Sequence, residues 1–255
     1  MMLHGKEIEA RKTAISIVVP TLDEAENIGT LIHRCLRETA GLDVEIIVMD
    51  DGSKDGTAER VNAIASTHPV RLIERADPVN GLTGAILAGA RAARHDIVVV
   101  MDADLSHPPD RILDLAAPII AGEKDMVIGS RYIPGGRTPG WPWQRRMMSR
   151  AASSLARPLT HVRDCLSGFF AVRRKFITQL APDAAGFKVA LEILVRSGRS
   201  LRVAEIPIIF RDRERGVSKM NGRVAVTYLR RLIVLFCVSI FGNRKAPVLV
   251  ESVEG

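Results

Sequence analysis

The feature that most constrains the fold is a set of β-branched apolar runs that end directly in acidic segments. Such runs occupy residues 15–19, 44–49 and 97–101, and each leads straight into a polar segment, at 20–24, 50–53 and 102–106. An uninterrupted apolar run is typical of a parallel strand that is covered on both faces. Ligands in open α/β sheets bind beyond the carboxyl ends of the strands. The sequence therefore predicts three acidic loops that converge at one edge of a sheet.

Strands and helices alternate along the first half of the chain. Helical periodicity covers residues 27–38, 57–66 and 84–94, and shorter apolar runs at 70–73 and 125–128 have the character of strands. This alternation predicts an α/β fold with a mostly parallel sheet and helices on both faces. The second half adds a Gly- and Pro-rich loop, a basic helix, a strand, a charged loop and a C-terminal helix, at residues 129–140, 145–159, 201–210, 211–223 and 224–241. We expect a catalytic domain over residues 1–223 and a C-terminal helix and tail over 224–255.

Composition and charge narrow the class of protein. The chain has 255 residues, of which 47% are hydrophobic and 25% charged, so a folded globular protein is expected. Its net charge of +7 favours polyanionic partners such as phosphorylated substrates, anionic lipid or nucleic acid. Cys35, Cys165 and Cys237 form no CxxC pair, which argues against a zinc site and fits a reducing compartment.

The C-terminal helix has the character of a membrane-surface segment. Arg230 and Arg231 precede an apolar run over residues 232–241, which is shorter than the about 20 residues that a membrane crossing needs. The arginines would meet lipid headgroups while the run enters the interface. Packing on the core, or a truncated membrane anchor, would give the same pattern. With no signal peptide among the first 14 residues, we expect a peripheral or weakly anchored protein at the cytoplasmic face of a membrane, compatible with a membrane-anchoring partner protein.

Asp102 and Asp104 form the most informative polar motif. They flank Ala103 directly after a buried strand, and side chains two residues apart in an extended segment point the same way. Paired carboxylates hold hard cations such as Mg²⁺ or Mn²⁺, which neutralise charge on a departing diphosphate. The alternative is a turn or helix-capping aspartate, but the position at the end of a strand favours the metal site.

The other acidic loops carry weaker signals. Asp51 is expected to accept hydrogen bonds from a ribose or a base edge, and Asp50 either does the same or only satisfies loop amides. Asp55 is expected to cap a helix and lies outside our predicted site. Glu24 would face a polar ligand edge, unless its loop is simply solvated. His107 is interpreted as a hydrogen-bonded loop residue rather than as a catalytic base.

Several strings together resemble a known family. VVPTLDEAENI, VMDDGSKDGT, MDADLSHPP, IGSRY and LSGFFAVRR, in this order, are similar to the family 2 glycosyltransferases of the GT-A fold. Within that family they most resemble the dolichyl- or polyprenyl-phosphate mannose synthases, over residues 15–230. The resemblance implies a metal-dependent, inverting transfer of mannose from GDP-mannose to a polyprenyl (dolichyl) phosphate.

The resemblance also implies roles for individual residues. The donor would be bound by Pro20, Leu22, Glu24, Asp51, Asp102, Ala103, Asp104, Arg213 and Lys219. The metal would be held by Asp102 and Asp104 with Ser106 as a weak third ligand. Among the many arginines of the middle third, Arg131, Arg145 and Arg146 would bind the acceptor phosphate, because a guanidinium grips phosphate through two donors. Asp102, Asp104 and Arg131 would be catalytic.

Some positions depart from the family pattern and leave alternatives open. Ser106 stands where Gln is common, Leu22 where an aromatic residue is common and Asp23 where Asn is common. The segment NGLTGA exchanges the Gly and hydroxyl positions of the usual string. A family 2 enzyme that uses UDP-glucose, another donor or a different acceptor is the first alternative. A basic nucleic-acid-binding module is the second, and the aromatic content of 4% disfavours it.

Overall fold

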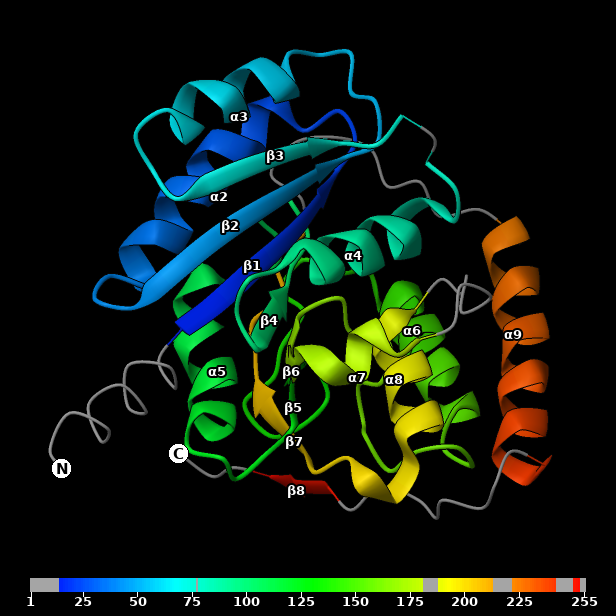
Figure 1. Cartoon of the computed structure of the whole chain (residues 1–255). Helices are drawn as coiled ribbons and strands as arrows, with labels where there is room; N and C mark the ends of the chain where they lie inside the picture. Colours follow the sequence, from blue (N-terminus) through cyan, green and yellow to red (C-terminus); the bar gives the residue numbers. More distant parts are fainter. Residues whose placement is uncertain (1–13, 77, 181–187, 213–221, 242–249, 253–255) are drawn as a thin grey trace, which may run out of the picture.

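The computed structural model describes residues 14–76, 78–180, 188–212, 222–241 and 250–252. These residues form one sheet in the order β3-β2-β1-β4-β6-β5-β7-β8 (Figure 1). The strands are β1 (Ala14–Thr21), β2 (Asp43–Asp50), β3 (Val70–Glu74), β4 (Ile97–Val100), β5 (Met126–Ser130), β6 (Phe170–Arg173), β7 (Val203–Pro207) and β8 (Val250–Ser252).

Helices cover both faces of this sheet. The α-helices are α2 (Ala25–Glu38), α3 (Thr57–Ala65), α4 (Gly81–Ala92), α5 (Ile112–Ile120), α6 (Trp143–Leu155), α7 (Arg174–Thr178), α8 (Val189–Ser197) and α9 (Gly222–Phe241), with 3-10 turns η1 (Pro109–Arg111) and η2 (Gly198–Ser200). Buried side chains of α2, α3 and α5 share one apolar cluster, and those of α4, α7 and α8 share the other. The predicted α/β fold with helices on both faces is confirmed.

The sheet is mixed because one strand runs against its neighbours. β6 pairs antiparallel with both β4 and β5, whereas the other pairs are parallel. The sequence analysis did not predict β6, which is only four residues long. The strand predicted over 201–210 is shortened to Val203–Pro207, and beyond it only an isolated bridge joins Ile209 to Arg137 among the described residues.

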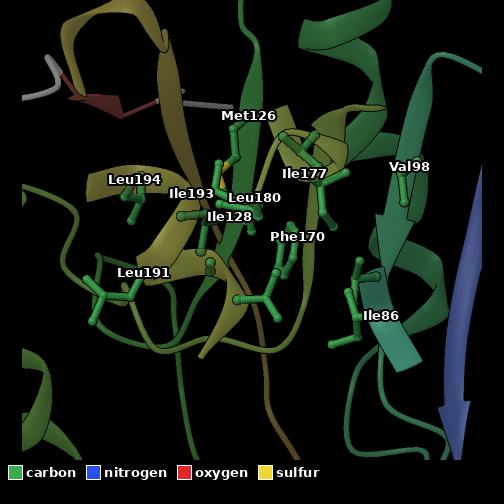
Figure 2. Packing of buried hydrophobic residues seen from close by; sticks show 14 of the residues in the cluster. Ile86, Val98, Met126, Ile128, Phe170, Ile177, Leu180, Leu191, Ile193 and Leu194 are labelled. Atoms are coloured by element: carbon green, nitrogen blue, oxygen red, sulfur yellow. The ribbon is translucent and has the colours of Figure 1, made fainter. Parts of the chain in front are cut away.

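The string FFAV fills both layers of the core. Phe169 and Ala171 belong to the apolar cluster on one face, and Phe170 and Val172 to the cluster on the other. Figure 2 shows Phe170 among side chains contributed by β5, α7 and α8. Side chains alternate between faces along a strand, so two consecutive phenylalanines serve two layers. Burying each contributes about 1.5–3 kcal/mol.

The C-terminal helix lies beside α8 at one side of the molecule (Figure 1). Leu235 is its fully buried contact, and Tyr228 donates a hydrogen bond to the carbonyl of Ala152. Within the described ranges, no helix has the length and hydrophobicity that a membrane crossing requires. The division near residue 223 stays a prediction, and β8, which lies beyond it, adds a strand to the same sheet.

Candidate donor and metal site

The three acidic loops meet because their strands are neighbours. β1 pairs with β2 on one side and with β4 on the other, all in parallel, so the loops after these strands leave the same sheet edge. The prediction of convergence follows directly from this order. The loops after β2 and β4 therefore lie on either side of the loop after β1, the central strand of the three.

The first two loops are tied together by hydrogen bonds. Asp23 is central: its backbone N–H donates to Ser53 Oγ (2.8 Å), and its carboxylate accepts the N–H of Lys54 (2.9 Å). Asp23 has a φ of 57°, a left-handed conformation that Asp and Asn tolerate better than most residues. Further bonds run from Thr21 to Asp50, from Glu24 to Thr57, from Ala25 to Asp55 and from Asp51 to Thr21.

Two of the aspartates hold the loops rather than a ligand. Asp50 accepts from the N–H groups of Gly52 and Ser53, so the reading in which it only satisfies loop amides is the one the contacts support. Asp55 accepts the N–H of Thr57 at the start of α3 (3.1 Å), although the N-cap residue itself is Gly56 rather than the predicted Asp55. Burial would raise the pKa of Asp55, but the hydrogen bonds from Thr57 and Ala25 lower it.

Asp51 differs from both. Its Oδ1 is buried, lies 3.1 Å from Nε of Arg75 and accepts no hydrogen bond in the described structure. Burial raises the pKa of Asp51, Arg75 acts in the opposite direction, and Asp50 adds to the rise. Arg75 also donates to the carbonyls of Gly81 (3.2 Å) and Val79 (3.0 Å), at the turn before α4. The carboxylate of Asp51 therefore pairs with the side chain of Arg75, which also joins it to the turn before α4.

The loop after β4 presents two carboxylates of different exposure. The side chain of Asp102 is 37% exposed, whereas Asp104 is 4% exposed and accepts the N–H of Ser106 (3.1 Å). Ala103 between them is buried. Leu105 takes a φ of 62°, which is strained for a side chain of its size and turns the loop back on itself.

The donor set suits a hard divalent cation. Asp102 and Asp104 supply carboxylate oxygens, and the buried hydroxyl of Ser106 has no hydrogen-bond partner among the described residues. Oxygen donors of this kind are those that Mg²⁺ and Mn²⁺ prefer. No group of three or more His, Cys, Asp or Glu side chains with metal-binding geometry occurs in the described ranges. Two carboxylates would therefore need further oxygens from a diphosphate or from water.

Arg131 is held by a partner that the sequence analysis missed. Its Nε and Nη2 donate to the two carboxylate oxygens of Asp164, each at 2.7 Å, and its backbone N–H donates to the same carboxylate at 2.9 Å. Burial lowers the pKa of Arg131, but Asp164 outweighs it and raises the pKa above its usual range. Glu205 on β7 fixes Asp164 in turn, accepting the N–H groups of Arg163 (2.9 Å) and Asp164 (3.0 Å).

Trp141 joins two of the predicted acceptor-binding arginines. The guanidinium of Arg145 lies 4.0 Å from the Trp141 ring centroid, and that of Arg131 lies 5.5 Å from it. Phe210 packs edge-on against the same indole ring. Arg145 also pairs with Asp212 (2.7 Å), while Arg146 is exposed on α6. The structure thus brings Arg131 and Arg145 together around one aromatic side chain, and leaves Arg146 on the surface.

The remaining predicted residues fall at the edge of this site. Pro20 is buried in β1, Leu22 is 43% exposed, and Glu24 accepts a hydrogen bond from Asn27 (2.9 Å). Arg213 and Lys219 lie outside the described residues. The backbone just before them is anchored to the site, because the N–H of Arg211 donates to the carbonyl of Ser106 (3.2 Å).

Lys188 is a further cation near the site that the sequence analysis did not single out. It directly precedes α8. Burial and the charge of Arg131 lower the pKa of Lys188, whereas Asp102 and Asp164 act in the opposite direction. A lysine within reach of these charges lies far from them in sequence, so only the fold reveals it.

Comparison with known proteins identifies relatives over most of the chain. A family model described as glycosyl transferase family 2 matches residues 16–180. A dolichol-phosphate mannosyltransferase of Pyrococcus furiosus is 38% identical over 86% of this chain, and the chain spans 62% of that relative. The protein of the same description from Saccharomyces cerevisiae is 37% identical over 89% of each chain.

A solved structure resembles the fold at lower identity. Glucosyl-3-phosphoglycerate synthase from Mycobacterium tuberculosis, crystallised with Mn²⁺, UDP-glucose and phosphoglyceric acid, superposes with a TM-score of 0.66. It is 29% identical, and the match covers 89% of this chain and 83% of that one. The fold comparison and the sequence comparison therefore agree on the class of enzyme, but the relatives that they identify are named for different substrates.

Proposed function

Because the chain belongs to glycosyltransferase family 2, we propose that it transfers mannose from GDP-mannose to a polyprenyl (dolichyl) phosphate with inversion at the sugar carbon. The observation that carries this proposal is the set of relatives named as dolichol-phosphate mannosyltransferases or polyprenol monophosphomannose synthase, 36–39% identical over 81–89% of the chain. The acidic loops supply a chemically suitable site, and the net charge of +7 suits two phosphorylated substrates.

The proposed reaction is a single displacement. An oxygen of the acceptor phosphate attacks C1 of mannose from the face opposite to GDP, and the bond from C1 to the diphosphate oxygen breaks with its electron pair leaving on GDP. A phosphomonoester is ionised near neutral pH, so a strong general base is not required. Positioning and electrostatic stabilisation then supply most of the catalysis.

We assign the metal to Asp102 and Asp104, with the hydroxyl of Ser106 beside them. A bound Mg²⁺ or Mn²⁺ supplies positive charge to the diphosphate as it departs. The carboxylate of Asp51, oriented by Arg75, would contact the nucleoside, and the backbone around Pro20, Leu22 and Glu24 would frame it. The Mn²⁺ in the structurally similar synthase supports a divalent cation without choosing between the two metals.

For the acceptor phosphate, the contacts refine the roles of the arginines. Nε and Nη2 of Arg131 donate hydrogen bonds to Asp164, so Nη1 is the nitrogen that would donate to a phosphate oxygen. Arg145 reaches the same place across Trp141, and Arg146 contributes charge from the surface of α6. Arg213 and Lys219 remain proposed donor-phosphate ligands from the charged loop.

A second candidate uses UDP-glucose as donor and a small phosphorylated acceptor. The fold match to a synthase crystallised with UDP-glucose and phosphoglyceric acid favours it. Purified protein with Mg²⁺ or Mn²⁺ separates the two candidates when GDP-mannose and UDP-glucose are each offered with polyprenyl phosphate and with 3-phosphoglycerate. We expect a mannosylated lipid phosphate from the first pairing alone. Turnover of UDP-glucose with no turnover of GDP-mannose would overturn the proposal.

The metal site has its own test. Asp104→Asn should abolish product formation while the melting temperature stays close to that of the parent, and excess chelator should do the same reversibly. Asp114→Asn is the matched control, because this exposed carboxylate on α5 pairs with Arg111 at 2.8 Å and lies outside the site. Full activity of Asp104→Asn, or activity in chelator, contradicts the assignment.

We further propose that α6 and α9 rest on a membrane surface. Both helices expose large apolar side chains beside arginines: Trp143, Met147, Met148 and Leu155 on α6, and Leu229, Ile233, Val234, Phe236 and Ile240 on α9. A helix with such a face and basic neighbours binds the headgroup region rather than crossing the bilayer. The acceptor lipid would be reached from the same surface.

Vesicle co-sedimentation tests the membrane surface. The parent protein should bind vesicles that contain anionic lipid and bind less to vesicles of neutral lipid, because the arginines contribute. Ile233→Glu places a charge on an apolar residue of α9 that is 65% exposed, and should weaken binding. Leu113→Glu on α5, where the side chain is 40% exposed, is the matched control. Equal binding by both variants would argue against α9 as the contact.

A further inference from the structure

The loop after β4 depends on a histidine, whose side chain accepts a backbone hydrogen bond at the point where strand pairing ends. We propose that His107, held as its Nε2–H tautomer, is a positioning residue for the metal-binding carboxylate of Asp102. The effect that we expect on metal binding rests on the proposed function. The contacts that carry the inference are properties of the free protein.

The first step concerns the backbone of Asp102. The N–H of Met101 still donates to Val18 in β1, at 3.2 Å, but that of Asp102 donates to Nδ1 of His107, at 3.0 Å. A buried N–H without an acceptor is costly, so a side chain must replace the strand that no longer supplies one. His107 closes the six-residue loop from Asp102 back onto its own first N–H.

The second step is the tautomer. Nδ1 accepts a hydrogen from Asp102, so it carries no proton of its own. A neutral imidazole then has its proton on Nε2. Nε2 lies 3.8 Å from Oδ2 of the same aspartate, too far for a hydrogen bond but close enough for the N–H dipole to favour the carboxylate on that side. One ring therefore contacts both the backbone and the carboxylate of Asp102.

The third step is rigidity, since a ring can position a ligand only if it is itself fixed. His107 is 2% exposed and stacks on Phe169, with ring centroids 5.2 Å apart and planes 13° apart. Phe210 packs edge-on against the imidazole at 5.4 Å. Gly168 closes the remaining side, where a Cβ would lie 3.2 Å from Cε1 of His107. These contacts enclose the ring on three sides and limit its movement.

A partner that orients a metal-binding side chain has a measurable effect on the metal. Loss of such partners typically weakens metal affinity or activity by about 10- to 100-fold. A residue that only stabilises the fold would lower the melting temperature without changing the affinity of the folded protein for Mn²⁺. The two roles therefore separate in a binding measurement on folded variants.

The tautomer is tested first, by ¹⁵N NMR of the imidazole nitrogens in the full chain without metal. The His107 signals are assigned by their loss in His107→Asn. We expect the Nε2–H form in the metal-free chain, and we expect it to persist when diamagnetic Mg²⁺ and GDP are added. A ring protonated on Nδ1 would overturn the proposal, whatever the enzyme's substrate.

Two variants then test positioning. In His107→Asn, the side-chain oxygen occupies the place of Nδ1 and keeps the acceptor for the N–H of Asp102. His107→Phe keeps the ring and its stacking on Phe169 but removes both nitrogens. We expect Mn²⁺ binding in the presence of GDP to weaken about 10-fold or more in His107→Phe and markedly less in His107→Asn.

The outcomes distinguish this inference from the proposed function. Equal Mn²⁺ affinity in the parent and in folded His107→Phe would overturn the positioning role even if mannose transfer is confirmed. Affinity lost equally in both variants would overturn the part assigned to the Nδ1 hydrogen bond. If the parent binds Mn²⁺ as expected but transfers no mannose, the proposed function fails while the role of His107 stands.

Discussion

Asp164 grips Arg131 through two hydrogen bonds of 2.7 Å to its guanidinium and one of 2.9 Å to its backbone N–H. A guanidinium fixed in this way cannot rotate to follow a ligand, so the direction of its remaining nitrogen is set by the protein. Asp164 is itself held by Glu205 on β7, whose carboxylate accepts its backbone N–H. The position of Arg131 therefore depends on Glu205, which lies on another strand.

Asp164→Asn should be among the most destabilising single substitutions in the site. It leaves a buried guanidinium without its counter-charge, and breaking a buried pair typically costs about 3–5 kcal/mol. Denaturant unfolding measures the loss. Asp212→Asn is the matched control, because its bond to Arg145 is largely exposed and should contribute less than about 1 kcal/mol. Similar unfolding free energies for the two variants would contradict the special role of Asp164.

Gly168→Ala should weaken metal binding more than it weakens the fold. The added methyl would sit 3.4 Å from both carboxylate oxygens of Asp102 and 3.2 Å from the imidazole of His107. Overpacking of this kind costs about 1–3 kcal/mol, here at the metal ligand itself. Titration with Mn²⁺ and thermal melting give the two readouts. Gly29→Ala in α2 is the control: its Cβ meets only Ile64 at 3.9 Å, and helix propensity should stabilise it by about 0.5–1 kcal/mol. Unchanged Mn²⁺ affinity in Gly168→Ala would refute this reading.

Arg75→Lys should raise the KM for the nucleotide-sugar donor by several-fold and change kcat less. A lysine cannot contact Asp51 and the carbonyls of Val79 and Gly81 at once, because that grouping needs the planar fork of a guanidinium. Steady-state kinetics against donor concentration provide the check. Arg71→Lys, on β3 itself but paired with Glu45 at the opposite sheet edge, should leave the KM for the donor unchanged. A fall in kcat alone would place Arg75 outside the nucleoside pocket.

Glu45 should make the stability depend on pH in the acid range. Burial would raise its pKa, but hydrogen bonds from Arg94, Ser16 and Arg71 outweigh burial and lower it below 4.5. A carboxylate with a lowered folded-state pKa contributes stability above its unfolded pKa, and that contribution is lost as the pH falls through the folded value. The free energy of unfolding should therefore decline below pH 4.5.

Glu45→Gln isolates this contribution. The variant should be less stable at pH 7 and should show a shallower decline below pH 4.5, because it has no carboxylate to protonate. Urea denaturation at a series of pH values measures both. Glu38→Gln is a suitable control, since that carboxylate bonds its neighbour Arg37 on the surface and shows no comparable network. Parallel pH profiles for the parent and Glu45→Gln would contradict the assignment.

The sequence was most informative where a local pattern determines structure. Continuous β-branched runs predicted β1, β2 and β4, because strands buried on both faces must be apolar throughout. The acidic loops followed from the strand ends, whereas the N-cap position of α3 is taken by Gly56 and not by Asp55. The three loops converge for the same reason, since the strands that carry them are adjacent in the sheet.

What the sequence did not predict depends on contacts between distant segments. Asp164 lies 33 residues from Arg131, and Glu205 lies 41 residues from Asp164, so no periodicity links them. β6 was missed because four residues between two loops give too short a pattern. Trp141 offered no signal at all, since an indole between two guanidiniums is defined only by the fold.

The bonds between the loops after β1 and β2 have a consequence for protein engineering. Asp23 donates a hydrogen bond to Ser53 and accepts one from Lys54, while Thr57 and Asp55 accept hydrogen bonds from the start of α2. The conformation of each loop therefore depends on the residues of the other. In a chimaera that takes only one of these loops from a relative with another donor, the new loop would not match its hydrogen-bond partners in the other loop. Exchange of residues 21–24 together with 50–57 is the smallest graft that carries its own geometry.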